Sequence, residues 1–405
     1  MFFLVALIIL WIMHGYVAWR VVPTLGLNTS YTLLAYITIF FLSLLPLIPI
    51  LLRVIGNEAK FIDKLSLLGY TSLGFFTLSF LIFVAKDIFI QFISILDSLI
   101  NTQEVTDNSK RDFLKKSLAL GTLGITGTAS AYGFYSARNG PGILKQDIFL
   151  ESLPDEYENF TIAQISDLHV GPTIKRPYVE GVLNKISQIN PDLIAVTGDL
   201  VDGSVEHLRS DLEPLKDMIA DHGTYFVTGN HEYYSGVDRW LNETDRLGMT
   251  NLINDNKIIS KQGQKIAIAG ITDYKAHHIK PAHRSNPKKA LESVPNNMTK
   301  IMLAHQPNSI HAVHDAGVDL QISGHTHGGQ FWPLTYPTKL ANAYLAGHYD
   351  HFGTQIYVNR GTSVCDVLIS VACRCRRLHC RIARWRLGSS WSSGSGHRLR
   401  PRWRA

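Results

Sequence analysis

Acidic residues, histidines and one asparagine recur along the chain in spacings that suit metal binding. The motifs, in order, are Asp167-Leu168-His169, Gly198-Asp199-Leu200-Val201-Asp202, Gly229-Asn230-His231-Glu232, the single His305, and Gly324-His325-Thr326-His327. Each motif alone is common, but their occurrence together and in this order is informative. Imidazole nitrogens combined with carboxylate and amide oxygens, without a thiolate, suit Mn, Fe, Zn or Ni and suit Ca poorly. The sequence therefore predicts a site for divalent metal ions.

Each motif follows a short apolar run that we predict to be a buried strand. These runs are residues 160–165, 193–197, 225–228, 301–304 and 320–323. Amphipathic helices are predicted between strands at 177–189, 206–220, 237–247 and 308–314. The pair 251–259 and 265–270 reads as adjacent strands of a second sheet. Such alternation predicts an α/β layered fold, whose ligands gather at the carboxyl ends of the strands.

The spacing within the motifs bears on how two metals could share one site. Asp199 has two carboxylate oxygens and can bridge two ions, which lie about 3.5–4 Å apart in two-metal hydrolases. Asp167 and His169 are separated by one residue, and so are His325 and His327. In an extended segment this spacing directs both side chains to the same face. We therefore expect both pairs to lie in extended backbone.

The motif series resembles the calcineurin-like metallophosphoesterase superfamily. That family's pattern is D-x-H, G-D-x-x-D, G-N-H-[DE], a single H, and G-H-x-H, and every motif residue is present between Gln164 and Gln330. The apolar N-terminal region resembles the bacterial membrane-anchored branch of the superfamily. The resemblance implies an α/β fold built as a two-sheet β-sandwich flanked by helices. It also implies an enzyme that hydrolyses phosphate mono- or diesters with a hydroxide bridging two divalent metals.

The resemblance further implies a role for each motif residue. One metal would be held by Asp167, His169, Asp199 and His327. The other would be held by Asp199, Asn230, His305 and His325, so that Asp199 is the bridge. His231 would act beside the leaving oxygen as a general acid or charge stabiliser, with Asp202 orienting it. An Asp–His pair suits that task because the carboxylate fixes the imidazole tautomer and favours its protonated form.

The first third of the chain predicts a multi-pass membrane protein. Four stretches, 1–19, 21–52, 65–85 and 117–137, lack charged residues and are long enough to cross a bilayer, while 88–100 reads as an interfacial segment. Lys and Arg concentrate between the third and fourth stretches, which predicts a cytoplasmic loop there and an extracytoplasmic catalytic domain. The segment 109–116 resembles a twin-arginine export signal with Lys110 in place of the first arginine, and reads equally as a basic flank.

The last residues differ in composition from the rest of the chain. Residues 371–405 contain ten arginines and no acid, which exceeds the whole formal charge of +6. The remainder is mildly acidic, so we expect no nucleic-acid partner. All four cysteines lie between Cys365 and Cys380, and their spacing matches no zinc site. We predict a transmembrane region of about four helices at 1–144, a metallophosphoesterase domain at 145–362, and an Arg/Cys/Ser-rich tail at 363–405 that is frameshifted, disordered, or a basic segment for anionic lipid.

Two other interpretations of the function are possible besides that of an enzyme. The same fold could serve as a non-catalytic membrane-bound binding or sensor protein, although the complete ligand set argues against this. A nucleic-acid binder led by the arginine tail is disfavoured by the acidic body and the membrane anchor. The expected partners are membrane lipid and a phosphoester that is lipid- or envelope-derived. That substrate class follows only from the predicted location.

Overall fold

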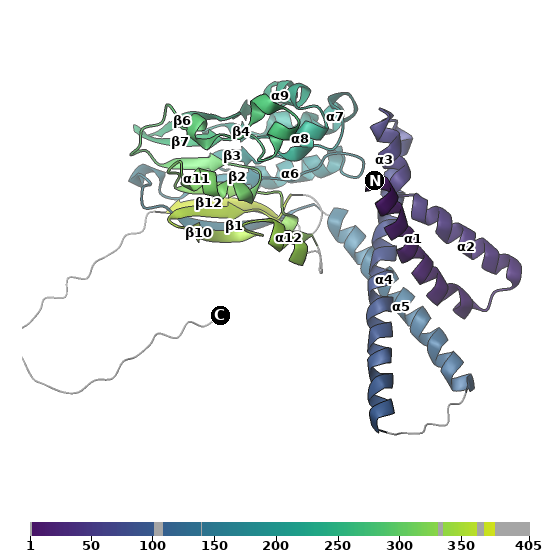
Figure 1. Cartoon of the computed structure of the whole chain (residues 1–405). Coiled ribbons are helices and arrows are strands. Elements are labelled where there is room, and N and C mark those ends of the chain that lie inside the picture. The colour runs from purple at the N-terminus through teal and green to yellow at the C-terminus, as the bar shows by residue number, and fades with distance from the viewer. Residues whose placement is uncertain (1, 101–107, 139, 331–334, 363–367, 377–405) are drawn as a thin grey trace, which may run out of the picture.

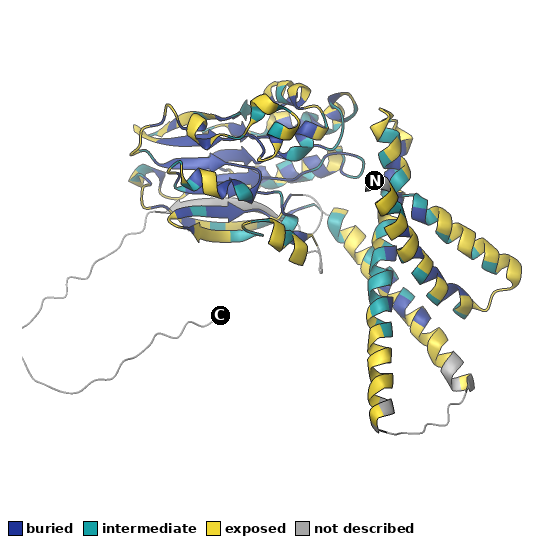
Figure 2. Cartoon of the chain, viewed as in Figure 1, coloured by how far each residue is buried: buried dark blue, intermediate teal, exposed yellow. Residues whose placement is uncertain are grey.

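The computed structural model describes residues 2–100, 108–138, 140–330, 335–362 and 368–376 (Figure 1). A group of long helices precedes a compact α/β sandwich. The helices are α1 (Phe2–Val21), α2 (Thr29–Leu44), α3 (Leu47–Val54), α4 (Lys60–Ile100) and α5 (Asn108–Arg138). They pack around a cluster that includes Val17 of α1, Phe76 and Phe83 of α4, and Ala119 of α5. Much of their outer surface is exposed and apolar (Figure 2), as lipid contact requires.

Three of these helical segments are long and apolar enough to cross a membrane: Leu4–Leu25, Thr29–Val54 and Lys60–Leu96. The predicted stretch 21–52 is interrupted, because a short 3-10 turn (Val22–Leu25) follows α1 and a break at Pro46 separates α2 from α3. Proline lacks the amide proton that a continuous helix needs. The segment 88–100 is not a separate interfacial element, since it continues α4 without a break.

The fourth predicted span also differs from expectation. Residues 117–137 do form helix, as the greater part of α5, but α5 is not among the segments that meet the length and hydropathy requirement in the described chain. Its Gly, Ala, Ser and Thr content lowers its hydropathy. Figure 1 shows that α4 runs away from the sandwich and that α5 returns to it.

Two six-stranded sheets form the sandwich. The first has the order β1-β12-β2-β3-β4-β5 and the second β10-β11-β9-β8-β7-β6. The first sheet comprises β1 (Gly142–Phe149), β12 (Leu368–Arg376), β2 (Phe160–Ile165), β3 (Leu193–Val196), β4 (Thr224–Phe226) and β5 (Thr250–Asn251). The second comprises β10 (Gly347–His351), β11 (Thr354–Val358), β9 (Leu320–Ser323), β8 (Lys300–Leu303), β7 (Gln264–Gly270) and β6 (Asp255–Lys261).

Three apolar layers hold the sandwich together. Between the sheets, Phe160 and Ile162 of the first pack with Ile268 and Leu303 of the second. On the outer side of the first sheet lie α6 (Arg176–Ile189), α7 (Val205–Leu212) and α9 (Val237–Arg246). The outer side of the second sheet is covered by α10 (Pro287–Ala290) and α11 (Ile310–His314). The predicted two-sheet sandwich flanked by helices is confirmed (Figure 2).

Most predicted strands agree with the observed ones to within two residues. The strand predicted at 251–259 is instead two separate strands, β5 and β6, which belong to different sheets. Several other elements were not anticipated. The helix predicted at 206–220 ends at Leu212 and continues as a 3-10 turn (Glu213–Asp217) that contains Pro214. Strands β1, β10 and β11, and helix α12 (Thr335–Ala341), were not predicted. Part of the atypical tail also forms a strand, because β12 pairs in parallel with β1 and antiparallel with β2. The rest of the tail, 377–405, lies outside the described residues.

Candidate metal centre

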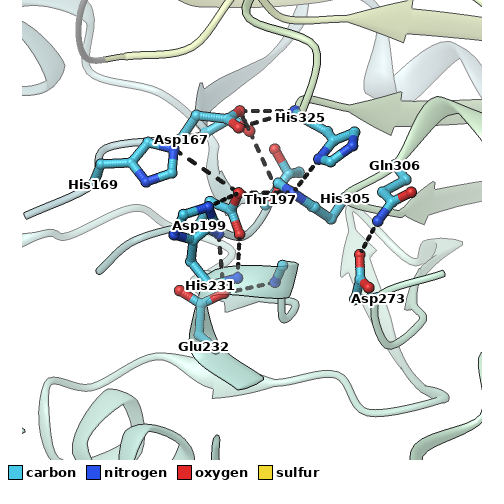
Figure 3. Close-up of polar contacts among 12 residues, drawn as sticks. Asp167, His169, Thr197, Asp199, His231, Glu232, Asp273, His305, Gln306 and His325 are labelled. Atoms are coloured by element: carbon cyan, nitrogen blue, oxygen red, sulfur yellow. Dashed lines mark hydrogen bonds and ion pairs between the residues drawn. The ribbon is translucent and has the colours of Figure 1, made fainter. Parts of the chain in front are cut away.

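The predicted ligands meet at one edge of the sandwich, where strands of both sheets end. Strands β2, β3 and β4 run parallel in the first sheet, and β8 and β9 run parallel in the second. Their carboxyl ends therefore deliver Asp167, Asp199, His305 and His325 to a common edge (Figure 3). Asn230, at the start of α8 (Asn230–Tyr234), follows the end of β4.

The pairs expected in extended backbone are instead in the left-handed region. The φ angles are 54° at Asp167, 48° at His169, 73° at His325 and 49° at His327, and Asp199 has 51°. The expectation of an extended segment was therefore wrong. Such angles are costly for residues other than glycine and cluster at functional sites. A turn at each strand end, rather than the alternation of a strand, directs these side chains inward.

The first group of potential ligands is Asp167, His169 and His327, whose ligand atoms all lie within 4.8 Å of one another. The Nε2 atoms of His169 and His327 face each other at 3.2 Å, and His327 Nε2 lies 3.4 Å from Asp167 Oδ1. Asp167 is fully buried, and both of its oxygens accept the His325 backbone N–H at 3.0 Å. This group has the spacing of ligands that converge on one ion.

The second group is Asp199, His305 and His325, again within 4.8 Å. Asp199 Oδ2 lies 3.1 Å from His305 Nε2, and His325 Nδ1 lies 3.2 Å from the same His305 nitrogen. His305 Nδ1 is 2.8 Å from the Thr197 carbonyl, to which it donates, so that Nε2 is directed into the site (Figure 3). This is how ligating histidines are commonly oriented.

Orphaned polar atoms show that the residues fit bound metal ions. Asn230 Oδ1 is buried and has no hydrogen-bond partner among the described residues. A buried amide oxygen without a partner costs about 1–3 kcal/mol, which a cation would offset. His169 Nε2 faces His327 Nε2, and His325 Nδ1 faces His305 Nε2, so two pairs of imidazole nitrogens converge within the site. The donor set of nitrogen and oxygen atoms suits divalent transition metals.

Asp202 links His231 to the first group. Asp202 Oδ1 accepts a hydrogen bond from His231 Nδ1, while Asp202 Oδ2 lies 3.0 Å from His169 Nδ1. The His231 backbone N–H also donates to Asp199 Oδ1 at 2.9 Å. The other ring nitrogen, Nε2, lies 3.9 Å from Asp199 Oδ2. His231 is the more exposed member of the cluster, with 34% of its side chain accessible, so it borders the opening of the site.

The electrostatics of the metal-free site separate the histidines into two kinds. Burial opposes the charged form of His169, but Asp202, Asp199 and Asp167 outweigh it and raise its pKa to about 9. Burial likewise opposes charge on His231, and Asp202 still raises the pKa of that imidazole. His325 is different, since burial and the charge of His305 lower its pKa to about 4. It is therefore already neutral, as a metal ligand must be.

Comparison with known proteins gives the family. The family model for calcineurin-like phosphoesterases matches residues 160–329. An uncharacterized metallophosphoesterase of Aquifex aeolicus is 31% identical over 192 residues, covering 47% of this chain and 72% of that protein. The chain belongs to the calcineurin-like phosphoesterase family.

Longer relatives share the family domain. A Danio rerio transmembrane protein with metallophosphoesterase domain is 34% identical over 263 residues, covering 62% of this chain and 59% of the relative. A Helicobacter pylori metallophosphoesterase is 37% identical over 258 residues, covering 62% and 66%. This metallophosphoesterase chain thus spans less than two thirds of either relative. Because matches occur in animals as well as bacteria, the similarity is not confined to a bacterial branch.

One important residue of this metallophosphoesterase domain was not singled out from the sequence. Glu232 is buried, and its carboxylate accepts the backbone N–H groups of Asp199 at 3.0 Å, Leu200 at 2.7 Å and Gly229 at 2.7 Å. It therefore fixes the loop that carries Asp199. Its place in the Gly229–Glu232 motif was the one sequence feature that pointed to it. Its partners are backbone N–H groups, and a sequence pattern cannot predict which of these lie nearby.

Proposed function

We propose that this protein is a metal-dependent phosphoesterase that hydrolyses phosphate mono- or diesters at a two-metal centre. The observation that carries the proposal is the pair of ligand groups, Asp167–His169–His327 and Asp199–His305–His325, set side by side with His231 at their open edge. Asn230 would complete the second group. Asp199 lies between the two groups, 3.1 Å from His305 and 3.9 Å from His169, which suits a bridging role.

The metal ions, when bound, would supply Lewis acidity and lower the pKa of a coordinated water. The protein's own residues would supply proton transfer and orient the catalytic groups. His231 would donate a proton, or stabilise charge, at the leaving oxygen, because Asp202 holds its Nδ1 and leaves Nε2 free to face the substrate. Asp202 contacts His169 as well, so one carboxylate orients both an acid and a ligand. The identity of the two ions remains Mn, Fe, Zn or Ni.

The proposed catalytic domain extends slightly beyond the range expected from sequence. That range was 145–362, with the membrane region at 1–144 and the tail at 363–405. We include β1 from Gly142 and β12 to Arg376, because both strands pair within the first sheet. The tail beyond Arg376 then forms the third region of the chain.

A multi-pass arrangement with an extracytoplasmic domain is part of the same proposal. The α3–α4 turn contacts the catalytic domain, so both lie on one side of the membrane. Helix α4 leaves that side and α5 returns to it (Figure 1), which requires α5 to cross if α4 does. The basic residues near the start of α5 favour the cytoplasm for the opposite side.

The location of the site favours a phosphoester in the headgroup of a membrane lipid. Arg53, one residue from the end of the candidate span Thr29–Val54, donates to the carbonyl of Asp202 at 3.4 Å. The residue that orients His231 therefore lies within one side chain of a membrane-spanning segment. A water-soluble substrate would gain nothing from this proximity, whereas a lipid headgroup would be presented at the site.

The proposal is tested with the full-length protein in detergent, loaded with Mn²⁺ and assayed on para-nitrophenyl phosphate and bis(para-nitrophenyl) phosphate. Asp199→Ala should abolish both turnover and stoichiometric metal binding, because it removes the bridging carboxylate. His231→Ala should retain metal while kcat falls by about 10²–10⁴-fold, the usual contribution of a general acid. Metal-loaded wild-type protein without turnover on either substrate would favour a binding or sensing role instead.

A further inference from the structure

The turn that joins α3 to α4 lies against the catalytic domain beside the metal centre. Glu58 in this turn accepts the backbone N–H of Ser204 at 3.1 Å and also accepts the Ser204 hydroxyl. Arg53, in the last turn of α3, donates to the Asp202 carbonyl at 3.4 Å. We call Arg53, Glu58 and Asp63 the turn network. Two of its members thus bond directly to the loop that follows Asp199.

Asp63, in the first turn of α4, anchors the turn network to two other elements of the domain. Its carboxylate lies 2.7 Å from Arg53 Nη2, 2.7 Å from Lys175 Nζ and 3.1 Å from His207 Nε2. Only 12% of the Asp63 side chain and 17% of the Arg53 side chain are exposed. Ion pairs this well shielded are less screened by salt than surface pairs, and breaking them costs more. The turn is therefore held in a defined position.

The contacts converge on the residues that position His231. Asp202 orients His231, and its immediate neighbours Gly203 and Ser204 are fixed from two sides. Trp240 Nε1 donates to the Gly203 carbonyl at 3.0 Å from within the domain. On the membrane side, Glu58 is so close that a Cβ added to Gly203 would lie 3.2 Å from its Oε1. Without the α3–α4 turn, the Gly203–Ser204 segment would keep the hydrogen bond from Trp240 but lose its contacts with Glu58.

We propose that the turn network is a positioning element of the active site, in which Glu58 and Arg53 hold the Asp202–Ser204 loop so that Asp202 orients His231. The inference rests on the proposed function, since it concerns the same site. Neither Glu58 nor Arg53 touches the substrate, and both act through Asp202. The membrane helices are thereby part of the catalytic apparatus, and turnover depends on how α3 and α4 are seated.

The test compares kcat, KM and metal content of full-length protein in detergent with bis(para-nitrophenyl) phosphate. Glu58→Ala should lower kcat about tenfold, less than the ~10²-fold that a 1 Å misplacement can cost, with KM and metal content unchanged. Glu58→Asp, which keeps the carboxylate, should recover part of the rate. The matched control is Glu180→Gln, an exposed acid of α6 that bonds only within its helix in the described structure, and it should match wild type.

A double-mutant cycle separates positioning from a general structural effect. In the His231→Ala background, Glu58→Ala should cause no further loss, because the network acts through His231. An equal tenfold loss in both backgrounds, or a Glu58→Ala rate within twofold of wild type, would overturn the inference. If Glu58→Ala does not fold, Glu58→Gln, which removes the charge and keeps the size of the side chain, is read in the same way. Failure of the wild type itself to turn over would instead overturn the proposed function, and this inference with it.

Discussion

At the scale of single residues, the proposed metal ligands differ in their preferred protonation state. His325 is neutral near physiological pH, whereas His169 and His305 have raised pKa values, because burial is outweighed by the nearby aspartates. A metal ion must displace the protons of the latter two before it can bind. Metal affinity should therefore be strongly coupled to pH.

The raised pKa of His169 predicts the direction in which metal affinity changes with pH. The pKa of His169 rises from 6.5 to about 9, so its proton stabilises the metal-free fold below pH 6.5 and this contribution is lost as pH rises towards 9. The apparent affinity for Mn²⁺ should consequently rise about tenfold per pH unit for each proton displaced. Calorimetric titration from pH 6 to 8 measures the slope. His222→Gln, before the amino end of β4 and so at the opposite end of that strand from the site, should keep that slope, and an affinity independent of pH would contradict the assignment.

That these carboxylates and imidazoles would gather at one place could be predicted from the sequence, because the motifs occur together, in order, each after a predicted strand. Their backbone geometry could not. Alternation in a strand predicted that Asp167 and His169 share a face, but both adopt positive φ. Glu232 was missed for a related reason, since its partners are backbone N–H groups brought together only by the fold.

At the scale of elements, close approaches between loops make glycine necessary at two positions. A Cβ on Gly324 would lie 1.8 Å from Ser166 Oγ and 2.3 Å from Asp167 Oδ2, and one on Gly229 would lie 2.2 Å from Asp199 Oδ1. Each glycine thus allows a loop of one strand to pack on the metal ligand of another. The strand ends and the ligand positions therefore depend on each other.

Gly324→Ala should therefore weaken both the fold and the metal site. Overpacking usually costs about 1–3 kcal/mol, and this contact lies at the severe end of that range. We expect a lower midpoint of thermal unfolding and a metal content below that of wild type, because Asp167 must move. Gly181→Ala, in helix α6 with nothing within 4 Å of the added methyl group, is the control and should be stabilised slightly. A Gly324→Ala protein with full metal content would refute this reading.

Periodicity predicted most core elements to within two residues, because buried strands and amphipathic helices leave strong patterns. It failed where proline or composition interrupted the pattern. The span 21–52 is divided at Pro46, and the helix 206–220 is divided near Pro214. The strand β12 could not be foreseen, because the surrounding residues have the composition of an unstructured tail.

At the scale of the whole molecule, the membrane helices and the catalytic domain are joined twice. The covalent link runs from α5 directly into β1, and the non-covalent link runs through Arg53, Glu58 and Asp63. In the proposed multi-pass arrangement, the α3–α4 turn lies on the same side of the membrane as the active site. The opposite ends of α4 and α5 then lie on the other side.

Cysteine labelling tests this topology directly, because residues before Cys365 contain no cysteine. In a background with the four native cysteines replaced by serine, Asn57→Cys in the turn should react with an impermeant maleimide added to intact cells. Ser109→Cys, near the start of α5, should react only after permeabilisation. The reverse pattern would invert the proposed orientation, and labelling of both positions in intact cells would exclude a crossing by α4.

The position of β12 has a consequence for the order in which the molecule is assembled. Among the described strands, β1 pairs only with β12, and β12 also pairs with β2. The segment joining the membrane to the sandwich therefore docks through a strand that the ribosome makes some two hundred residues later. Until that strand has been synthesised, the nascent sandwich has a gap between its first two strands, so β1 cannot join the sheet during synthesis of the residues before β12.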